Sequence, residues 1–233
     1  MDTSTWGPTL WDCLLLCARD LEPADVSAVL RLVRDLIPCA LCRASYRHWH
    51  RTYPLAEGDN AVEWLWYIHD LVNGKLGKPR LPLSKLLARL ATFECGVSPF
   101  DVVDTLLIMA RHIGPESDEA ADALCRLLPL FAKVVWPVSL RPRPMPRGST
   151  GPSAGALFDH LVLCKQEMLR DAGRPARVLD REHEWALYGG TLPLPVAVVP
   201  FYPKRRPRGT PAPVPRTQRR AVEAGARWRS VAR

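Results

Sequence analysis

Cys39 and Cys42 form the one tight C-x-x-C motif of the chain and are the residues best suited to carry chemistry. They follow Pro38, a residue that favours the first turn of a helix. A thiol at a helix N-terminus meets unpaired backbone N–H groups, which lower its pKa and favour the reactive thiolate, so we expect both pKa values to be lowered. Thiol–disulfide redox chemistry is therefore the leading interpretation. The alternative is a pair of helix-start cysteines without a redox role.

The other five cysteines say less about chemistry. No H-x3-H pair accompanies the single C-x-x-C, so a zinc site is disfavoured and we predict no metal. Cys13 and Cys17 lie one helical turn apart and are either a strained shuttle pair or, more in keeping with an apolar helix face, two small core residues. Cys95, Cys125 and Cys164 are isolated, and the sequence does not fix how they pair.

A second set of residues that could bind a ligand lies about thirty residues after the C-x-x-C. Spacings of four and three place five residues on one helix face: Val62, Trp66, His69, Asn73 and Leu76. On this face His69 and Asn73 can hydrogen-bond a planar heteroaromatic ligand while Trp66 packs against it. Alternatively, the two polar residues are an ordinary satisfied core pair.

The elements that must position these residues are predicted to be helices, because apolar residues recur at spacings of three and four and strand-like alternation is nearly absent. Proline, glycine and capping residues mark the helix ends. The predicted helices cover residues 8–20, 25–36, 39–51, 61–76, 83–92, 98–112 and 117–136, with Pro129 kinking or dividing the last of these, and a further one covers 155–172.

Charge and composition divide the chain of 233 residues, of which 47% are hydrophobic. Residues 1–139 hold 14 Lys+Arg and 17 Asp+Glu, a net charge of −3, whereas residues 140–233 hold 18 and 7, a net charge of +11. No uncharged apolar run approaches the roughly 20 residues that span a bilayer. We expect a catalytic domain (1–95), an additional helical region (96–140 and 153–190), a linker (141–152) and a disordered basic tail (203–233).

Three motifs together resemble the Erv/Alr family of flavin-dependent sulfhydryl oxidases, over about residues 6–90. They are Trp6-Gly7-Pro8-x-x-Trp11, then Pro38-Cys39-x-x-Cys42, then His69-Asp70-Leu71-Val72-Asn73-x-Lys75-Leu76-Gly77-Lys78-Pro79. Members from large DNA viruses are similar in two further ways, because they carry the minimal motif without a leader and some append an extra helical domain.

The resemblance implies a five-helix fold that holds FAD and passes electrons from dithiols to O2, giving H2O2. It implies that Cys42 is the flavin-proximal thiol and that Cys39 is the distal cysteine that exchanges with substrate. On the same basis, with helix-face and charge arguments added, the predicted FAD-binding residues are Gly7, Trp11, Leu15, Trp66, His69, Asp70, Val72, Asn73, Lys75 and Lys78.

Three positions depart from the family pattern. Leu15 stands where the family commonly has histidine, and Asp70 stands where it has asparagine, which would place an anion near the flavin. Leu83 stands where a structural cysteine often clips the fifth helix. These departures leave open a different class of function, a catalytically degenerate structural or nucleic-acid-binding virion protein on the same fold.

The expected partners follow from the same resemblance. They are protein dithiols or a small thiol carrier, O2, and a second copy of the chain in a homodimer. The basic tail suggests a weak nucleic-acid contact. We expect the protein in the host cytoplasm or virion, with the nucleus as an alternative, and not secreted.

Overall fold

The computed structural model describes residues 3–92, 97–113, 118–136, 153–173 and 186. Within these ranges the chain forms eight α-helices, as the all-α prediction requires. The helices are α1 Gly7–Asp20, α2 Pro23–Leu36, α3 Ala40–Thr52, α4 Ala61–Lys75, α5 Leu83–Ala91, α6 Pro99–His112, α7 Asp118–Val135 and α8 Ala154–Asp171. Their bounds agree with the predicted bounds to within two residues.

Local signals account for where these helices begin. A proline occupies the first turn of α1, α2 and α6, where its missing N–H costs no intrahelical hydrogen bond. The Asn60 side chain caps α4 by accepting the N–H groups of Val62 and Glu63 at 3.0 and 3.3 Å. Pro129 does not divide α7, which continues through it as one helix.

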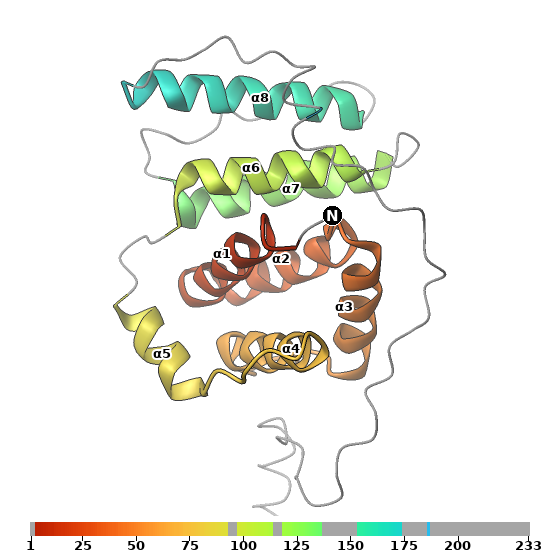
Figure 1. Cartoon of the computed structure of the whole chain (residues 1–233), viewed down its shortest axis with the longest axis vertical. Coiled ribbons are helices and arrows are strands. Elements are labelled where there is room, and N and C mark those ends of the chain that lie inside the picture. Colours follow the sequence, from red (N-terminus) through yellow and green to blue (C-terminus); the bar gives the residue numbers. More distant parts are fainter. Residues whose placement is uncertain (1–2, 93–96, 114–117, 137–152, 174–185, 187–233) are drawn as a thin grey trace, which may run out of the picture.

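The helices pack in layers (Figure 1). The first two helices, α1 and α2, lie in the middle. On one side α4 packs against α1 and α3 packs against α2, with α5 beside α4. On the other side α7 packs against both α1 and α2, α6 packs against α1, and α8 covers α6. The middle pair is therefore covered on two sides.

One hydrophobic core joins all these layers. It extends from Trp6 in the segment before α1 to Met168 in α8, and its fully buried side chains include Leu16, Phe131 and Phe158. The helices α6 to α8 thus share a core with the first five helices. The division into a catalytic domain and an additional helical region remains a prediction. Its linker and tail, and most of residues 174–190, lie outside the described residues.

Polar contacts hold α5 against α1, and Leu83, which stands where the family often has a structural cysteine, is the first residue of α5. Arg89 Nη2 donates to the Asp12 carboxylate at 2.7 and 2.8 Å, and Arg19 Nη1 donates to the Leu90 carbonyl at 3.0 Å.

None of the described helices combines the length and hydrophobicity needed to cross a membrane.

Candidate active site

The two cysteines of the C-x-x-C motif lie at the N-terminus of α3, as predicted. Cys39 is the N-cap residue, and its sulfur accepts the backbone N–H of Cys42 at 3.3 Å. The Cys42 thiol also donates to the Cys39 sulfur, with 2.7 Å between the two Sγ atoms. Both thiols are free and half-buried. Their separation is close enough for a disulfide to form with a small side-chain movement.

This arrangement shifts the pKa values of the two thiols in opposite directions. The hydrogen bond from Cys42 is the main factor that lowers the pKa of Cys39 to about 6, and backbone N–H groups of α3 add to it against the cost of burial. The same hydrogen bond, followed by burial, raises the pKa of Cys42. The prediction that both pKa values are lowered is therefore wrong for Cys42. The pair shares one proton, and a second negative charge beside the Cys39 thiolate is unfavourable.

Lys75 from the last turn of α4 lies beside this thiol pair. Its Nζ donates to Ser45 Oγ at 2.7 Å, and Ser45, three residues after Cys42, donates in turn to the Leu41 carbonyl at 2.9 Å. The Lys75 charge acts to lower the pKa values of both cysteines. We predicted a phosphate or ribose contact for Lys75, and the structure adds a contact with the thiol site. The role of Ser45 was missed, although its spacing from Cys42 places both on one face of α3.

Arg43 fixes the segment that leads into the C-x-x-C. Its NH1 donates to the carbonyl of Ile37, the C-cap residue of α2, at 2.7 Å. This bond satisfies a carbonyl at the end of α2 and ties the two helices together one turn after Cys39. The sequence analysis did not identify this residue, because the bond depends on how α2 and α3 meet.

The second predicted segment meets α1 through an aromatic contact. The rings of Trp11 and His69 stack with centroids 4.6 Å apart and an interplanar angle of 28°. Burial and, to a smaller degree, the positive charge of Lys78 lower the pKa of His69, so its ring is neutral at pH 7. Two residues that are 58 positions apart in the sequence thus stack against each other, and their rings form what we call the aromatic wall.

The remaining predicted ligand residues lie around this wall in different environments. Trp66 is half-buried, and its indole N–H donates to the Leu81 carbonyl at 2.7 Å, so its ring face is what remains for a ligand. Asn73 and Val72 are half-buried on α4, and Lys78 is exposed. Leu15 is buried in the core. A Cβ added at Gly7 would meet nothing within 4 Å, so this position has open space beside it.

The negative charge of Asp70 is compensated by an arginine of the same chain. Its carboxylate is buried on α4 and receives a two-pronged hydrogen bond from Arg80, which lies in the connection to α5. Arg80 Nε lies 2.9 Å from each carboxylate oxygen. The anion that this departure from the family pattern introduces is therefore paired with a guanidinium. Arg80 was not identified from sequence, although it follows Asp70 by only ten residues.

Cys13, Cys17 and Cys125 lack the lowered pKa of a reactive thiol. Cys13 and Cys17 are completely buried in α1, where burial raises the pKa of Cys17 to about 12 and that of Cys13 well above its usual value, so the core interpretation is confirmed. Burial also raises the pKa of Cys125, to about 11. Cys95 lies outside the described residues. In the described part of the chain, His, Cys, Asp and Glu side chains form no group of three that could hold a metal.

Comparisons with known proteins point to one family. Residues 16–91 match the Erv1 / Alr family. The chain is similar to the FAD-linked sulfhydryl oxidase ERV1 of Oryza sativa subsp. japonica, with 30% identity over 73 residues, which are 30% of this chain and 38% of that protein. It is also similar to the ERV1 protein of Arabidopsis thaliana, with 28% identity over 86 residues, 36% of this chain and 45% of that protein.

The matched region includes the C-x-x-C and all of α4 but begins after Trp11. The chain spans less than half the length of these relatives. No solved structure matches it significantly.

Proposed function

We propose that this chain, whose residues 16–91 match the Erv1 / Alr family, is an FAD-dependent sulfhydryl oxidase that forms disulfide bonds in protein dithiols and passes the electrons to O2, giving H2O2. One observation carries the proposal. The matched segment places a C-x-x-C at a helix N-terminus, with the two sulfurs within hydrogen-bond distance and a lysine beside the pair.

The residues on α1 and α4 fit a flavin nucleotide. Trp11 and His69 offer a planar wall, and Trp6 Nε1 is a buried donor with no acceptor among the described residues. The Lys78 charge beside His69 suits phosphate. We propose that FAD is held by this wall and by the other residues predicted from sequence. When bound, FAD supplies two-electron acceptance from a dithiol and reoxidation by O2.

The family resemblance gives the proposed order of thiol exchange, with Cys39 as the cysteine that meets the substrate. A substrate thiolate attacks Cys39 in the Cys39–Cys42 disulfide, a bond forms between substrate and Cys39, and Cys42 leaves with the electron pair. The Lys75 charge favours that departing thiolate. The second substrate thiol gives its proton to the Cys42 thiolate, attacks the substrate sulfur of the mixed disulfide and releases Cys39 as a thiolate. A thiol with a pKa of about 6 is a good leaving group, so this second step is fast.

These steps leave the substrate oxidised by two electrons and the cysteine pair reduced. Cys42 keeps a proton by donating it toward the Cys39 sulfur. In the reduced protein, the two adjacent sulfurs therefore carry one proton, on Cys42, and one negative charge, on Cys39.

A visible absorption spectrum followed by dithiol addition in air tests the proposal. We expect a yellow protein that bleaches, consumes O2 and recovers. Cys42→Ala is expected to abolish turnover while flavin is retained, and Cys39→Ala is expected to leave flavin reducible only by artificial reductants. Cys125→Ala, outside the motif, is the matched control. A protein that stays colourless and inactive after FAD is added would favour the degenerate structural protein instead.

We further propose that the oxidase acts in a viral disulfide pathway in the host cytoplasm or virion. Support comes from the resemblance to viral members and from the helices α6 to α8, which lie beyond the matched segment. Finding the native protein in mitochondria without a virus would contradict this.

A homodimer, and a nucleic-acid contact through residues 203–233, are proposed on the family resemblance and on charge respectively. The helices α6 and α7 cover one face of the α1–α2 pair, so that face is not available to a second copy of the chain. Sedimentation of the purified protein tests the dimer, and retention on immobilised nucleic acid before and after deletion of the tail tests the contact.

A further inference from the structure

Positive charge is concentrated around the C-x-x-C. Residues 26–56, which include most of α2, the two cysteines and all of α3, contain five arginines and one aspartate, a net charge of +4 with histidines neutral. The rest of residues 1–139 contains nine Lys+Arg and 16 Asp+Glu, a net charge of −7. The part of the chain that carries the reactive thiols is thus basic within an otherwise acidic region.

Three of these arginines follow the reacting sulfur along α3. Arg43, Arg47 and Arg51 are each four residues apart, and Cys39 precedes Arg43 by the same spacing. Residues spaced by four are neighbours on a helix surface, so they form one stripe that winds slowly away from Cys39. At a rise of 1.5 Å per residue the stripe is about 18 Å long. We call it the arginine stripe.

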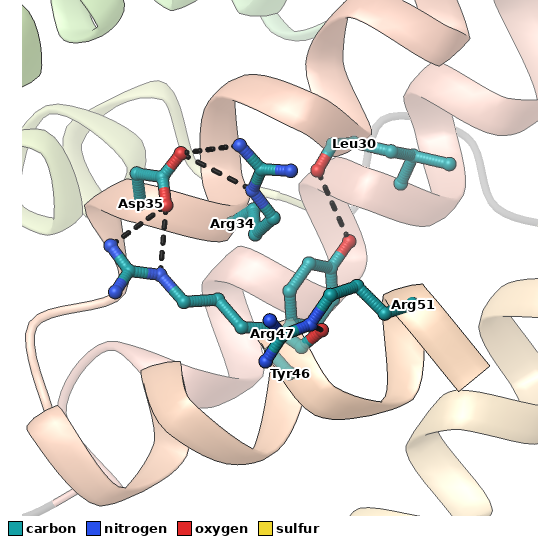
Figure 2. Close-up of polar contacts among 6 residues, drawn as sticks. All are labelled: Leu30, Arg34, Asp35, Tyr46, Arg47 and Arg51. Carbon is teal, nitrogen blue, oxygen red and sulfur yellow. Dashed lines mark hydrogen bonds and ion pairs between the residues drawn. The ribbon is translucent and has the colours of Figure 1, made fainter. Parts of the chain in front are cut away.

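Contacts with α2, and one within α3, fix this stripe in place (Figure 2). Arg47 Nε donates to Asp35 at 2.8 Å, and Arg34 from α2 donates to the same carboxylate at 3.0 Å. Arg51 Nε donates to the Arg47 carbonyl at 3.2 Å. A pre-positioned guanidinium loses less side-chain entropy when a ligand binds, so these anchors favour recognition.

The anchors leave most of the positive charge uncompensated. Within the described residues, Asp35 is the one carboxylate that the structure pairs with arginines of this segment. The Arg47 side chain remains 46% exposed despite that pairing, and Arg51 is exposed. Leu41, between the two cysteines in sequence, is 44% exposed but lies on another face of α3.

We propose that the arginine stripe forms a docking surface for an acidic segment that flanks the dithiol of a protein substrate. The inference rests on the proposed function, in which Cys39 is the cysteine that exchanges with substrate. Guanidinium groups pair with carboxylates in a two-pronged geometry that suits Asp and Glu side chains. An acidic polypeptide is favoured over nucleic acid because the stripe begins at the sulfur that must reach a substrate thiol.

An exchange reaction that needs no flavin tests the docking surface separately from oxidase activity. In the full-length Cys42→Ser protein, the Cys39 thiolate attacks a peptide cysteine that carries a thiopyridyl disulfide. The new bond joins Cys39 to the peptide, and thiopyridone leaves with the electron pair and absorbs light. One peptide has four Glu around its cysteine, and its partner has four Gln. The Cys39→Ser/Cys42→Ser protein gives the background from other thiols.

We expect the Glu peptide to react about tenfold faster than the Gln peptide at low ionic strength, as for other electrostatically steered encounters. The ratio falls toward one near 1 M salt, where the Debye length is about 3 Å. Arg47→Gln/Arg51→Gln, made in the Cys42→Ser protein, is expected to reduce the ratio at least twofold. Arg51→Gln alone reduces it less and leaves Asp35 fully paired. Arg126→Gln on α7, an exposed arginine outside the stripe, is the matched control.

The outcomes separate the two proposals. A ratio near one at low salt, or an equal loss in the Arg126→Gln control, overturns the docking surface even if the wild-type protein consumes O2 with a neutral dithiol. A large ratio in a protein that never consumes O2 retains the docking surface and rejects the oxidase. If a single-stranded oligonucleotide binds the stripe and the Glu peptide gains no rate, the surface recognises nucleic acid and the proposal is wrong.

Discussion

Replacing Cys42 by alanine is expected to raise the pKa of Cys39, because it removes the hydrogen bond that contributes most to the low value of about 6. A hydrogen bond to a charged group contributes about 1.5–3 kcal/mol, or about one to two pKa units. Cys39 is half-buried, so solvent screens part of this effect and we take the lower end. We therefore expect a pKa of about 7 in Cys42→Ala.

The rate of alkylation of the reduced protein by iodoacetamide, followed as a function of pH, measures this change. At pH 6 a rise of one unit lowers the thiolate fraction of Cys39 from about 50% to about 9%, so the rate falls about fivefold. Cys42→Ser is the matched variant, because its hydroxyl still donates to the Cys39 sulfur and keeps the pKa closer to 6. Equal pKa values for Cys39 in the Ala variant, the Ser variant and the wild type would refute the shared-proton description.

The same shift links the stability of the reduced protein to pH. The pKa of Cys39 is about 6 in the folded protein against an ordinary value of 9.0, so the thiolate is favoured by folding. Its contribution to the free energy of unfolding is fully present above pH 9 and is lost as the pH falls through 6. In Cys42→Ala, where the folded pKa is higher, this contribution is smaller.

Three further predictions concern other contacts. Lys75→Met is expected to raise the pKa of Cys39, since a nearby cation is lost, and the same alkylation profile detects it; Lys75→Arg should restore most of the effect. Arg80→Met leaves the buried Asp70 carboxylate without its partner and should lower the free energy of unfolding by about 1–3 kcal/mol, measured by urea unfolding. Adding Asp70→Asn to this variant should recover part of the loss. An NMR titration should find the pKa of His69 below its ordinary value of 6.5. The contribution of His69 to the free energy of unfolding is then present above pH 6.5 and is lost as the pH falls through the folded pKa. A measured pKa at or above 6.5 would contradict the burial argument.

The helices and the reactive motif could be predicted from the sequence because their signals are local. A capping residue such as Asn60 or a first-turn proline acts within three or four residues, and apolar spacing acts within two turns. The position of Cys39 at a helix N-terminus follows from the same signals. The resemblance of three motifs then suggested FAD, and the match of residues 16–91 supports that family.

The contacts that define the site required the tertiary structure. Lys75 and Ser45 are 30 residues apart, and Trp11 and His69 are 58 apart, so no helical periodicity relates them. The acidities of the two cysteines also depended on three-dimensional geometry. A helix N-terminus acts on both thiols, but the Cys39 sulfur also accepts the Cys42 backbone N–H and lies within hydrogen-bond distance of the Cys42 sulfur, which favours the charge on Cys39.

The sequence by itself determined where each helix lies and which residues can react, because backbone capping and hydrophobic periodicity are set by near neighbours. The packing of α4 against α1, and of α3 against α2, decided which charges surround those residues. Side chains from different helices meet only after their apolar faces are buried together. Electrostatic effects weaken with separation in space, so they depend on that packing rather than on position in the chain.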